Sequence, residues 1–213
     1  MHNYRIRKEK LEDYREVEEL TRKAFWNLNV PGCNEHYLAH IMRSHCDFIP
    51  ELDLVLEGHD CIIGSVMYAK SWLIDEDGVE KDILTFGPVS ILSEYQRKGY
   101  GKALLEASFT KAVELGYDTI VIFGNPDNYI GRGFKSCKKY DVSLENGIFP
   151  AAMLVKELKP GVLEGKRWRY RDSDVYNINE HDAEIFDQKF EKREKEYRTS
   201  QEEFYIHSHS RIL

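Results

Sequence analysis

A short run of glycines and cations is the part of the sequence with the clearest chemistry. It reads Gln96-Arg97-Lys98-Gly99-Tyr100-Gly101-Lys102 and lies where a predicted strand meets a predicted helix. The first N–H groups of a helix have no partner within it, and the helix dipole adds partial positive charge there. Gly99 and Gly101 carry no Cβ that would keep a ligand away from these groups. The run therefore predicts a site for a phosphate-bearing ligand, with an architectural strand-to-helix turn as the alternative.

The spacing of the glycines excludes two common phosphate loops. An NTPase loop needs Gly-x-x-x-x-Gly-Lys-Ser/Thr, and a dinucleotide fingerprint needs Gly-x-Gly-x-x-Gly. Residues 96–102 fit neither pattern. Arg97, Lys98 and Lys102 nevertheless place three cations here, in a chain whose net charge is −7.

The run resembles the Gln/Arg-x-x-Gly-x-Gly/Ala pyrophosphate signature of the GNAT superfamily of N-acetyltransferases. The preceding Gly87-Pro88-Val89-Ser90-Ile91 looks like that family's fourth strand, whose backbone groups pair with the pantetheine arm. The resemblance runs from about Tyr4 to Leu158 and looks closest to a bacterial subgroup of predicted acetyltransferases of unknown substrate. It implies acetyl-CoA as cosubstrate and no metal. The cofactor-binding residues that it implies are Val89, Ser90, Ile91, Gln96, Arg97, Lys98, Gly99, Tyr100, Gly101, Lys102 and Asn125.

A tyrosine downstream is the candidate catalytic residue. Asn125 and Tyr129, followed by Gly133-Phe134, resemble the second cofactor motif of the family. When an amine attacks a thioester, a thiolate leaves, and a nearby phenol O–H can protonate the sulfur. The resemblance gives Tyr129 this role of general acid. Asn125 is expected either to bind the pantetheine amide or to cap a short helix that begins near Asp127.

The general base and the acceptor pocket are less clearly marked. Ser90, Asp82, Glu94 or a chain of water molecules are the alternatives for the base. By resemblance, the acceptor pocket is expected between the first two helices and the β-meander. That region contains Cys33, Asn34, Glu35, His36, Tyr37, Tyr68 and Trp72, for each of which a structural role is the alternative.

The periodicity of apolar residues predicts the elements that position these groups. Strands are predicted over residues 4–7, 52–56, 62–74, 83–92, 118–123, 139–144 and 151–158, with helices over 14–25, 34–44 and 101–115. The fold class is mixed α/β (α+β): a mostly antiparallel sheet flanked by helices, with one central βαβ crossover and a C-terminal strand and helix extension.

Pro160-Gly161 marks a predicted boundary, because this pair breaks either kind of regular element. We therefore predict an acetyltransferase domain over residues 1–159 and an extension over 160–213. Residues 166–171 alternate basic and aromatic side chains, which is typical of an edge strand. Residues 180–198 read as a charged helix whose Phe face packs on the core or on a second subunit, so a homodimer is possible.

Composition excludes several other classes of protein. No apolar stretch approaches the ~20 residues of a membrane span, and no apolar segment follows the N-terminus. The four cysteines form no CxxC pair, which together with the missing leader predicts a cytoplasmic protein. The net charge of −7 argues against nucleic acid, and His207 and His209 lack the partners of a metal site.

The function expected from the sequence is an acetyl-CoA-dependent N-acetyltransferase. It would transfer acetyl directly to a primary amine of a small molecule or peptide. The alternative is a non-catalytic acyl-CoA-binding or regulatory module on the same fold, because a fold alone does not fix a function.

Overall fold

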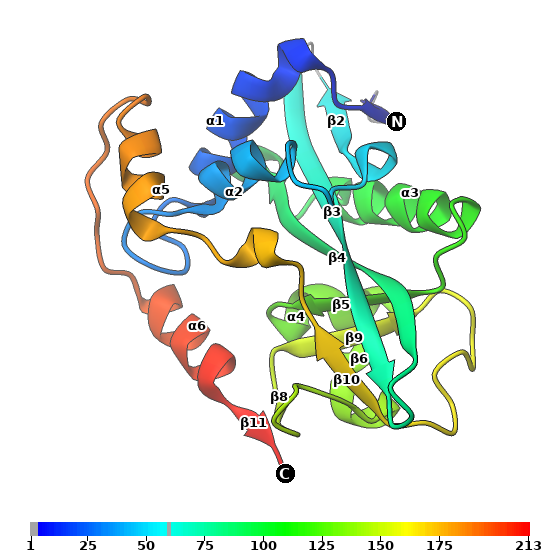
Figure 1. Cartoon of the computed structure of the whole chain (residues 1–213). Helices are drawn as coiled ribbons and strands as arrows, with labels where there is room; N and C mark the ends of the chain where they lie inside the picture. Colours follow the sequence, from blue (N-terminus) through cyan, green and yellow to red (C-terminus); the bar gives the residue numbers. More distant parts are fainter. Residues whose placement is uncertain (1–3, 59–60) are drawn as a thin grey trace.

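The computed structural model describes residues 4–58 and 61–213 and contains one large mixed sheet (Figure 1). Its main path runs β1-β2-β3-β4-β5-β9-β6, and β10 pairs with both β3 and β7. Its strands are β1 (Tyr4–Lys8), β2 (Leu54–Gly58), β3 (Cys61–Asp75), β4 (Glu80–Ile91), β5 (Thr119–Phe123), β6 (Lys135–Ser136), β7 (Val142–Ser143), β9 (Met153–Glu157) and β10 (Trp168–Arg171). A second sheet pairs β8 (Phe149–Pro150) with β11 (Arg211–Ile212).

Helices cover both faces of the sheet because its strands alternate between two sets of apolar side chains. Leu54 and Leu56 of β2 join the large core with α3 (Tyr100–Glu114), whereas Val55 packs with α1 (Tyr14–Phe25). On the α1 side, α2 (Glu35–Met42) packs against β3. The expected α/β class with a mostly antiparallel sheet is confirmed. No helix within residues 4–58 and 61–213 is long and apolar enough to cross a membrane.

The crossover from β4 through α3 to β5 is the expected βαβ unit. β4 and β5 run parallel, but their only paired position is Leu84 with Ile120. Beyond it the two strands diverge, although β4 continues to Ile91. On its other edge, where it pairs with β3, β4 has a bulge. Val66 pairs with Val89 and Tyr68 pairs with Phe86. Two residues of β4, Gly87 and Pro88, therefore face the single residue Met67 of β3.

Two predicted elements differ from the structure. The predicted strand 139–144 begins within a 3-10 turn, Cys137–Tyr140, and is extended only over the two-residue β7. The Ser136 side chain accepts from the Lys138 N–H and starts this turn, and Asp141 ends it in the left-handed conformation, at φ 53°. A local side-chain hydrogen bond therefore stabilises a turn here, where the alternation of apolar and polar residues alone predicted strand pairing.

The predicted helix 180–198 is also wrong in extent. Helix α5 covers only Glu180–Asp187, and a further helix, α6 (Thr199–His209), follows an extended connection. Trp26 and Asn27 donate side-chain hydrogen bonds to the Glu194 carbonyl and hold that connection against the α1–α2 loop. Contacts far apart in sequence thus override helical periodicity here.

The extension is joined to the main sheet through β10. This strand is antiparallel to β3 over Trp168–Arg171, and its first two residues also pair with β7. It is therefore an edge strand only over Tyr170–Arg171. Trp168 and Tyr170 are buried while Arg169 is exposed, which confirms the predicted alternation of faces.

Candidate active site

The glycine run forms a compact turn between β4 and α3. The Gln96 side-chain amide donates to the Ile91 carbonyl at 2.9 Å and ties the turn to the end of β4. Arg97 and Gly99 both have left-handed backbones, at φ 59° and 91°, and Gly99 is the N-cap residue of α3. The turn therefore presents the open end of a fifteen-residue helix to solvent, as the sequence predicts.

The two glycines differ in what they require. Among the described residues, no atom outside the two chain neighbours lies within 4 Å of a Cβ built at Gly99, but its φ of 91° strains any other residue. A Cβ at Gly101 would meet Ile91 Cγ1 at 3.5 Å, which is ordinary contact. Gly99 is thus required by the backbone of the turn, and the space beside it is open to a ligand.

The charged residues of the turn are exposed. Lys98 lies 5.8 Å from the centre of the Tyr95 ring, and Lys102 pairs loosely with Glu106 at 3.7 Å. Tyr100, by contrast, is buried against Tyr4 and Tyr95. Its side chain therefore belongs to the core, and only its backbone can face a ligand.

The second half of β4 offers backbone rather than side chains. Val89 and Ile91 pack into the core beneath α3, and the buried Ser90 hydroxyl donates to Thr21 of α1 at 3.1 Å. Because β5 does not pair with β4 here, the peptide groups of this stretch have no β5 partner on that edge, and we call this unpaired edge the opening between the two strands. The Ser90 side chain is engaged in packing α1 on the sheet and is a poor base candidate.

Tyr129 lies at the end of α4 (Pro126–Tyr129), directly beside β4. Its ring packs between Phe86 and Phe134, with centroids 5.8 and 5.7 Å away, and covers Gly124. A Cβ at Gly124 would approach Tyr129 Cε2 to 2.7 Å, so that only glycine fits there. Burial raises the pKa of Tyr129 to about 12, which keeps its proton on the oxygen at neutral pH.

Asn125 caps α4, which was one of its two expected roles. Its side-chain oxygen accepts from the Asp127 N–H at 3.0 Å, with Pro126 at the first helical position. The helix then tightens into a 3-10 turn, Ile130–Arg132. Asn125 therefore sets where Tyr129 lies, whatever else its amide contacts.

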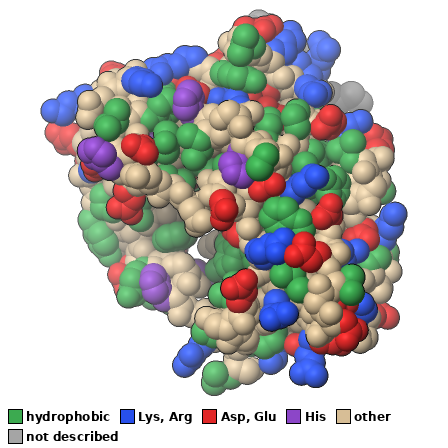
Figure 2. Space-filling model, in the orientation of Figure 1, with side chains coloured by type: hydrophobic (Ala, Val, Ile, Leu, Met, Phe, Trp, Pro, Cys, Tyr) green, Lys and Arg blue, Asp and Glu red, His purple; other side chains and the backbone are tan. Residues whose placement is uncertain are grey.

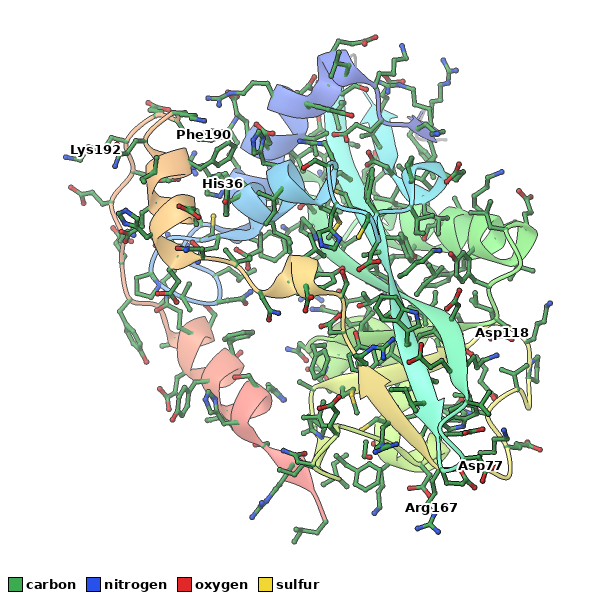
Figure 3. The ribbon with its side chains drawn as sticks, in the orientation of Figure 1. His36, Asp77, Asp118, Arg167, Phe190 and Lys192 are labelled. Atoms are coloured by element: carbon green, nitrogen blue, oxygen red, sulfur yellow. The ribbon has the colours of Figure 1, made fainter. Side chains whose placement is uncertain are left out.

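One residue of the expected acceptor region, His36, contacts α5 together with Arg22 of α1. Arg22 of α1 donates to both carboxylate oxygens of Asp187 at 2.6 and 3.2 Å, and His36 Nε2 lies 3.1 Å from the same carboxylate. His36 also faces Phe190, as Figure 3 shows, with ring centroids 5.0 Å apart. We call Arg22, His36 and Asp187 the α5 clamp.

Cys33 has no features of a nucleophile, although its Sγ lies 3.5 Å from His36 Nδ1. Burial raises the pKa of the Cys33 thiol, which disfavours the thiolate. Burial also lowers the pKa of His36 to about 4. Cys33 and His36 therefore pack as neutral groups beside the Arg22–Asp187 ion pair.

Tyr68 belongs to the expected acceptor region, whereas the other residues near the site did not stand out in the sequence. Tyr68 is fully buried and shares a 2.7 Å hydrogen bond with Ser108 of α3. Tyr170, Asp172 and Tyr176 come from the extension, and the Tyr176 hydroxyl lies 3.5 Å from the Gly87 carbonyl. No spacing in the sequence connects residues 170–176 with β4, so only the fold could reveal them.

One group of side chains could ligate a metal among the residues that the structure describes: His45, Cys46 and Asp47. These residues are consecutive, and two of them already have hydrogen-bond partners. Asp47 Oδ2 accepts from the Ser173 hydroxyl at 2.7 Å, and His45 Nδ1 accepts from the Asp47 N–H at 3.2 Å. We assign no metal to this group.

Comparison with known proteins agrees with this geometry. The model of the acetyltransferase (GNAT) family matches residues 14–134. The fold is similar to that of the GNAT family N-acetyltransferase YhbS from Escherichia coli in complex with CoA, with a TM-score of 0.71, 22% identity, and coverage of 84% of this chain and 94% of that one. It is also similar to a GNAT family acetyltransferase from Brucella melitensis in complex with acetyl-CoA, with a TM-score of 0.63, 21% identity, and coverage of 83% and 99%. No curated protein matches the sequence.

The family match spans more than half of the chain, from Tyr14 to Phe134. It includes both the glycine turn and Tyr129. The structural neighbours have the same fold over most of their length. The chain belongs to the GNAT family of acetyltransferases.

Proposed function

We propose that the protein is an acetyl-CoA-dependent N-acetyltransferase that acts on the primary amine of a small molecule or peptide. The observation that carries the proposal is the exposed glycine turn at the N-terminus of α3, beside the opening between β4 and β5. The turn suits a pyrophosphate, and the opening suits the extended arm that follows the pyrophosphate in CoA.

The residues present fit acetyl-CoA. The N–H groups from Gly99 to Lys102 would hold phosphate oxygens, because the space above Gly99 is empty of protein atoms. Arg97, Lys98 and Lys102 would add charge. The backbone of Val89–Ile91 would border the pantetheine arm, and the amide of Asn125 is a further candidate contact. Acetyl-CoA supplies an activated thioester, which an uncharged amine attacks directly.

In the proposed reaction Tyr129 holds a proton for the departing sulfur. The N–C bond forms as the C–S bond breaks, and the Tyr129 hydroxyl gives its proton to the thiolate. The attacking nitrogen loses a proton to solvent, and Tyr129 regains one from solvent before the next turnover. A phenol is suited to this role because its proton is retained until the thiolate forms. The packing of Tyr129 between Phe86 and Phe134 fixes the direction of its hydroxyl.

The decisive experiment is an assay of thiol release from acetyl-CoA over a panel of amines, amino acids, aminoglycosides, polyamines and peptides. We expect at least one amine to release CoA in proportion to acetylated product. Stabilisation by acetyl-CoA in a thermal melt without amine-dependent CoA release would instead support the non-catalytic binding module. A melt that acetyl-CoA does not change would contradict the donor site itself.

A further inference from the structure

The extension brings a polar cluster onto the α1–α2 side of β4. Tyr176 ends a 3-10 turn, Asp174–Tyr176, and its hydroxyl lies 3.5 Å from the Gly87 carbonyl at the bulge. Ser173 caps this turn by accepting from the Val175 N–H, and its hydroxyl donates to Asp47 at 2.7 Å. The position of Tyr176 beside β4 is therefore fixed from two directions.

Tyr129 lies on the other side of the same stretch of β4. Tyr129 packs with the core beneath α3, whereas Tyr176 packs with the cluster that contains α2. Tyr129 and Tyr68 both pack against Phe86, with ring centroids 5.8 and 5.2 Å from its own. An amine that approaches from the Tyr176 side would thus reach the opening between β4 and β5 on the side opposite Tyr129, the proposed proton donor.

Asp172 is the acidic member of this cluster, and burial raises the pKa of its carboxyl, so that a cation beside it would stabilise its ionised form. Its Oδ1 accepts from the Tyr170 hydroxyl at 2.8 Å and from the Ser173 N–H at 2.9 Å. Within residues 4–58 and 61–213, no hydrogen bond reaches its Oδ2 and no cation pairs with it, since Arg171 turns away to Glu80. A fixed carboxylate with one free oxygen, next to two aromatic rings, suits a cationic group.

The surroundings of this cluster restrict the size of the molecule that carries the cationic group. Figure 2 shows a hollow in this face of the molecule, between α6 and β10 as placed in Figure 1. Helix α6 frames the hollow, because Ser200 and Gln201 bond to the backbone of the α1–α2 loop at one end. At the other end the Ala151 N–H donates to the Ser210 carbonyl, and β11 pairs with β8. A compact acceptor fits such a frame better than a folded protein does.

The charge of Asp172 also indicates that its partner is not the nitrogen that reacts. A carboxylate favours the protonated form of an amine that it binds, whereas an amine must be neutral to attack a thioester. The acceptor then needs two amino groups, one held as an ammonium and one free to react.

We propose that Asp172, oriented by Tyr170 and flanked by Tyr176, binds one ammonium group of a compact diamine and directs its second amine to the opening of β4. This inference rests on the proposed N-acetyltransferase function and names its acceptor class.

The test compares 1,4-diaminobutane with n-butylamine at saturating acetyl-CoA. The native protein is expected to show a kcat/KM at least 30-fold higher for the diamine, mostly through KM. Asp172→Asn keeps an oxygen for Tyr170 and Ser173 but removes the charge, so we expect it to abolish this preference. Its turnover of n-butylamine and its affinity for acetyl-CoA should change less than 3-fold. Asp174→Asn, an exposed neighbour on the same turn, is the matched control and should retain the preference.

Equal use of the two amines by the native protein, or a preference that survives Asp172→Asn, would overturn the proposal. If neither amine is acetylated, ligand-observed NMR on the CoA-loaded protein tests the Asp172 site separately from the proposed acetyltransferase activity. Binding of 1,4-diaminobutane that is lost in Asp172→Asn would support this site while the proposed catalysis fails. Absence of such Asp172-dependent binding would refute the site.

Discussion

The two sides of β4 are built in different ways. The donor side consists of one continuous stretch, from Phe86 to Lys102, and of α4 shortly after it, and it offers mainly backbone groups. The α1–α2 side is assembled from distant segments: Arg22 meets Asp187, Asp47 meets Ser173, and Gly87 meets Tyr176. A surface made of backbone can serve one unchanging cofactor, whereas a surface made of side chains from an extension can differ from one enzyme to another.

The largest expected effect concerns Gly99. In Gly99→Glu a carboxylate occupies the open N-terminus of α3, where the phosphates are proposed to bind. We expect acetyl-CoA affinity, measured by calorimetry, to fall by roughly 100-fold or more, because like charges placed together cost several kcal/mol. The variant should also lose about 1–2 kcal/mol of folding stability through its left-handed backbone.

Gly116→Glu is the matched control for that loss. Gly116 follows the other end of α3, with φ 94°. In the part of the chain that the structure describes, no atom outside its two chain neighbours lies within 4 Å of a built Cβ. It should therefore show the same fall in stability with unchanged acetyl-CoA affinity. Equal loss of affinity in the two variants would mean that backbone strain, and not the donor site, explains the effect.

Tyr129→Phe should reduce kcat by about 100-fold, since removal of a general acid typically costs at least that much. Acetyl-CoA affinity should change less than 2-fold, because the ring still packs between Phe86 and Phe134. With its pKa near 12, Tyr129 should cause no fall in kcat as pH rises to about 10, because the donor form persists there. An unchanged kcat in this variant would remove Tyr129 from the proposed mechanism.

The α5 clamp should affect only the α1–α2 side. Asp187→Ala leaves Arg22, whose side chain is 5% exposed, without its carboxylate. We expect a loss of about 2 kcal/mol in a denaturant melt, less than for a fully buried pair because Asp187 itself is 25% exposed. Acetyl-CoA affinity of the folded variant should not change.

Glu184→Ala removes another α5 carboxylate, which makes only an exposed 3.6 Å contact with Lys195. This variant should cost less than about 0.5 kcal/mol. If both variants cost the same, the clamp does not hold α5.

The contrast between the two sides also explains what the sequence could predict. Strand, turn and helix around Gly99 follow from local rules on glycine, helix termini and apolar periodicity, so the crossover and its turn were predicted correctly. The end of α5 at Asp187 depends on hydrogen bonds from Trp26 and Asn27 to Glu194, which no local pattern encodes. Asp172 went unnoticed for the same reason, because its significance comes from Tyr170, Tyr176 and a strand nearly ninety positions away.

The divergence of β4 and β5 after Leu84 and Ile120 has a thermodynamic consequence. The peptide groups along Val89–Ile91 are unpaired with β5 before any ligand arrives, so no hydrogen bonds between these two strands must be broken to admit one. The entropy of ordering this surface is lost once, when the chain folds, and not again at each binding event. Little of the free energy of binding is then spent on rearranging the protein, which is the meaning of preorganisation.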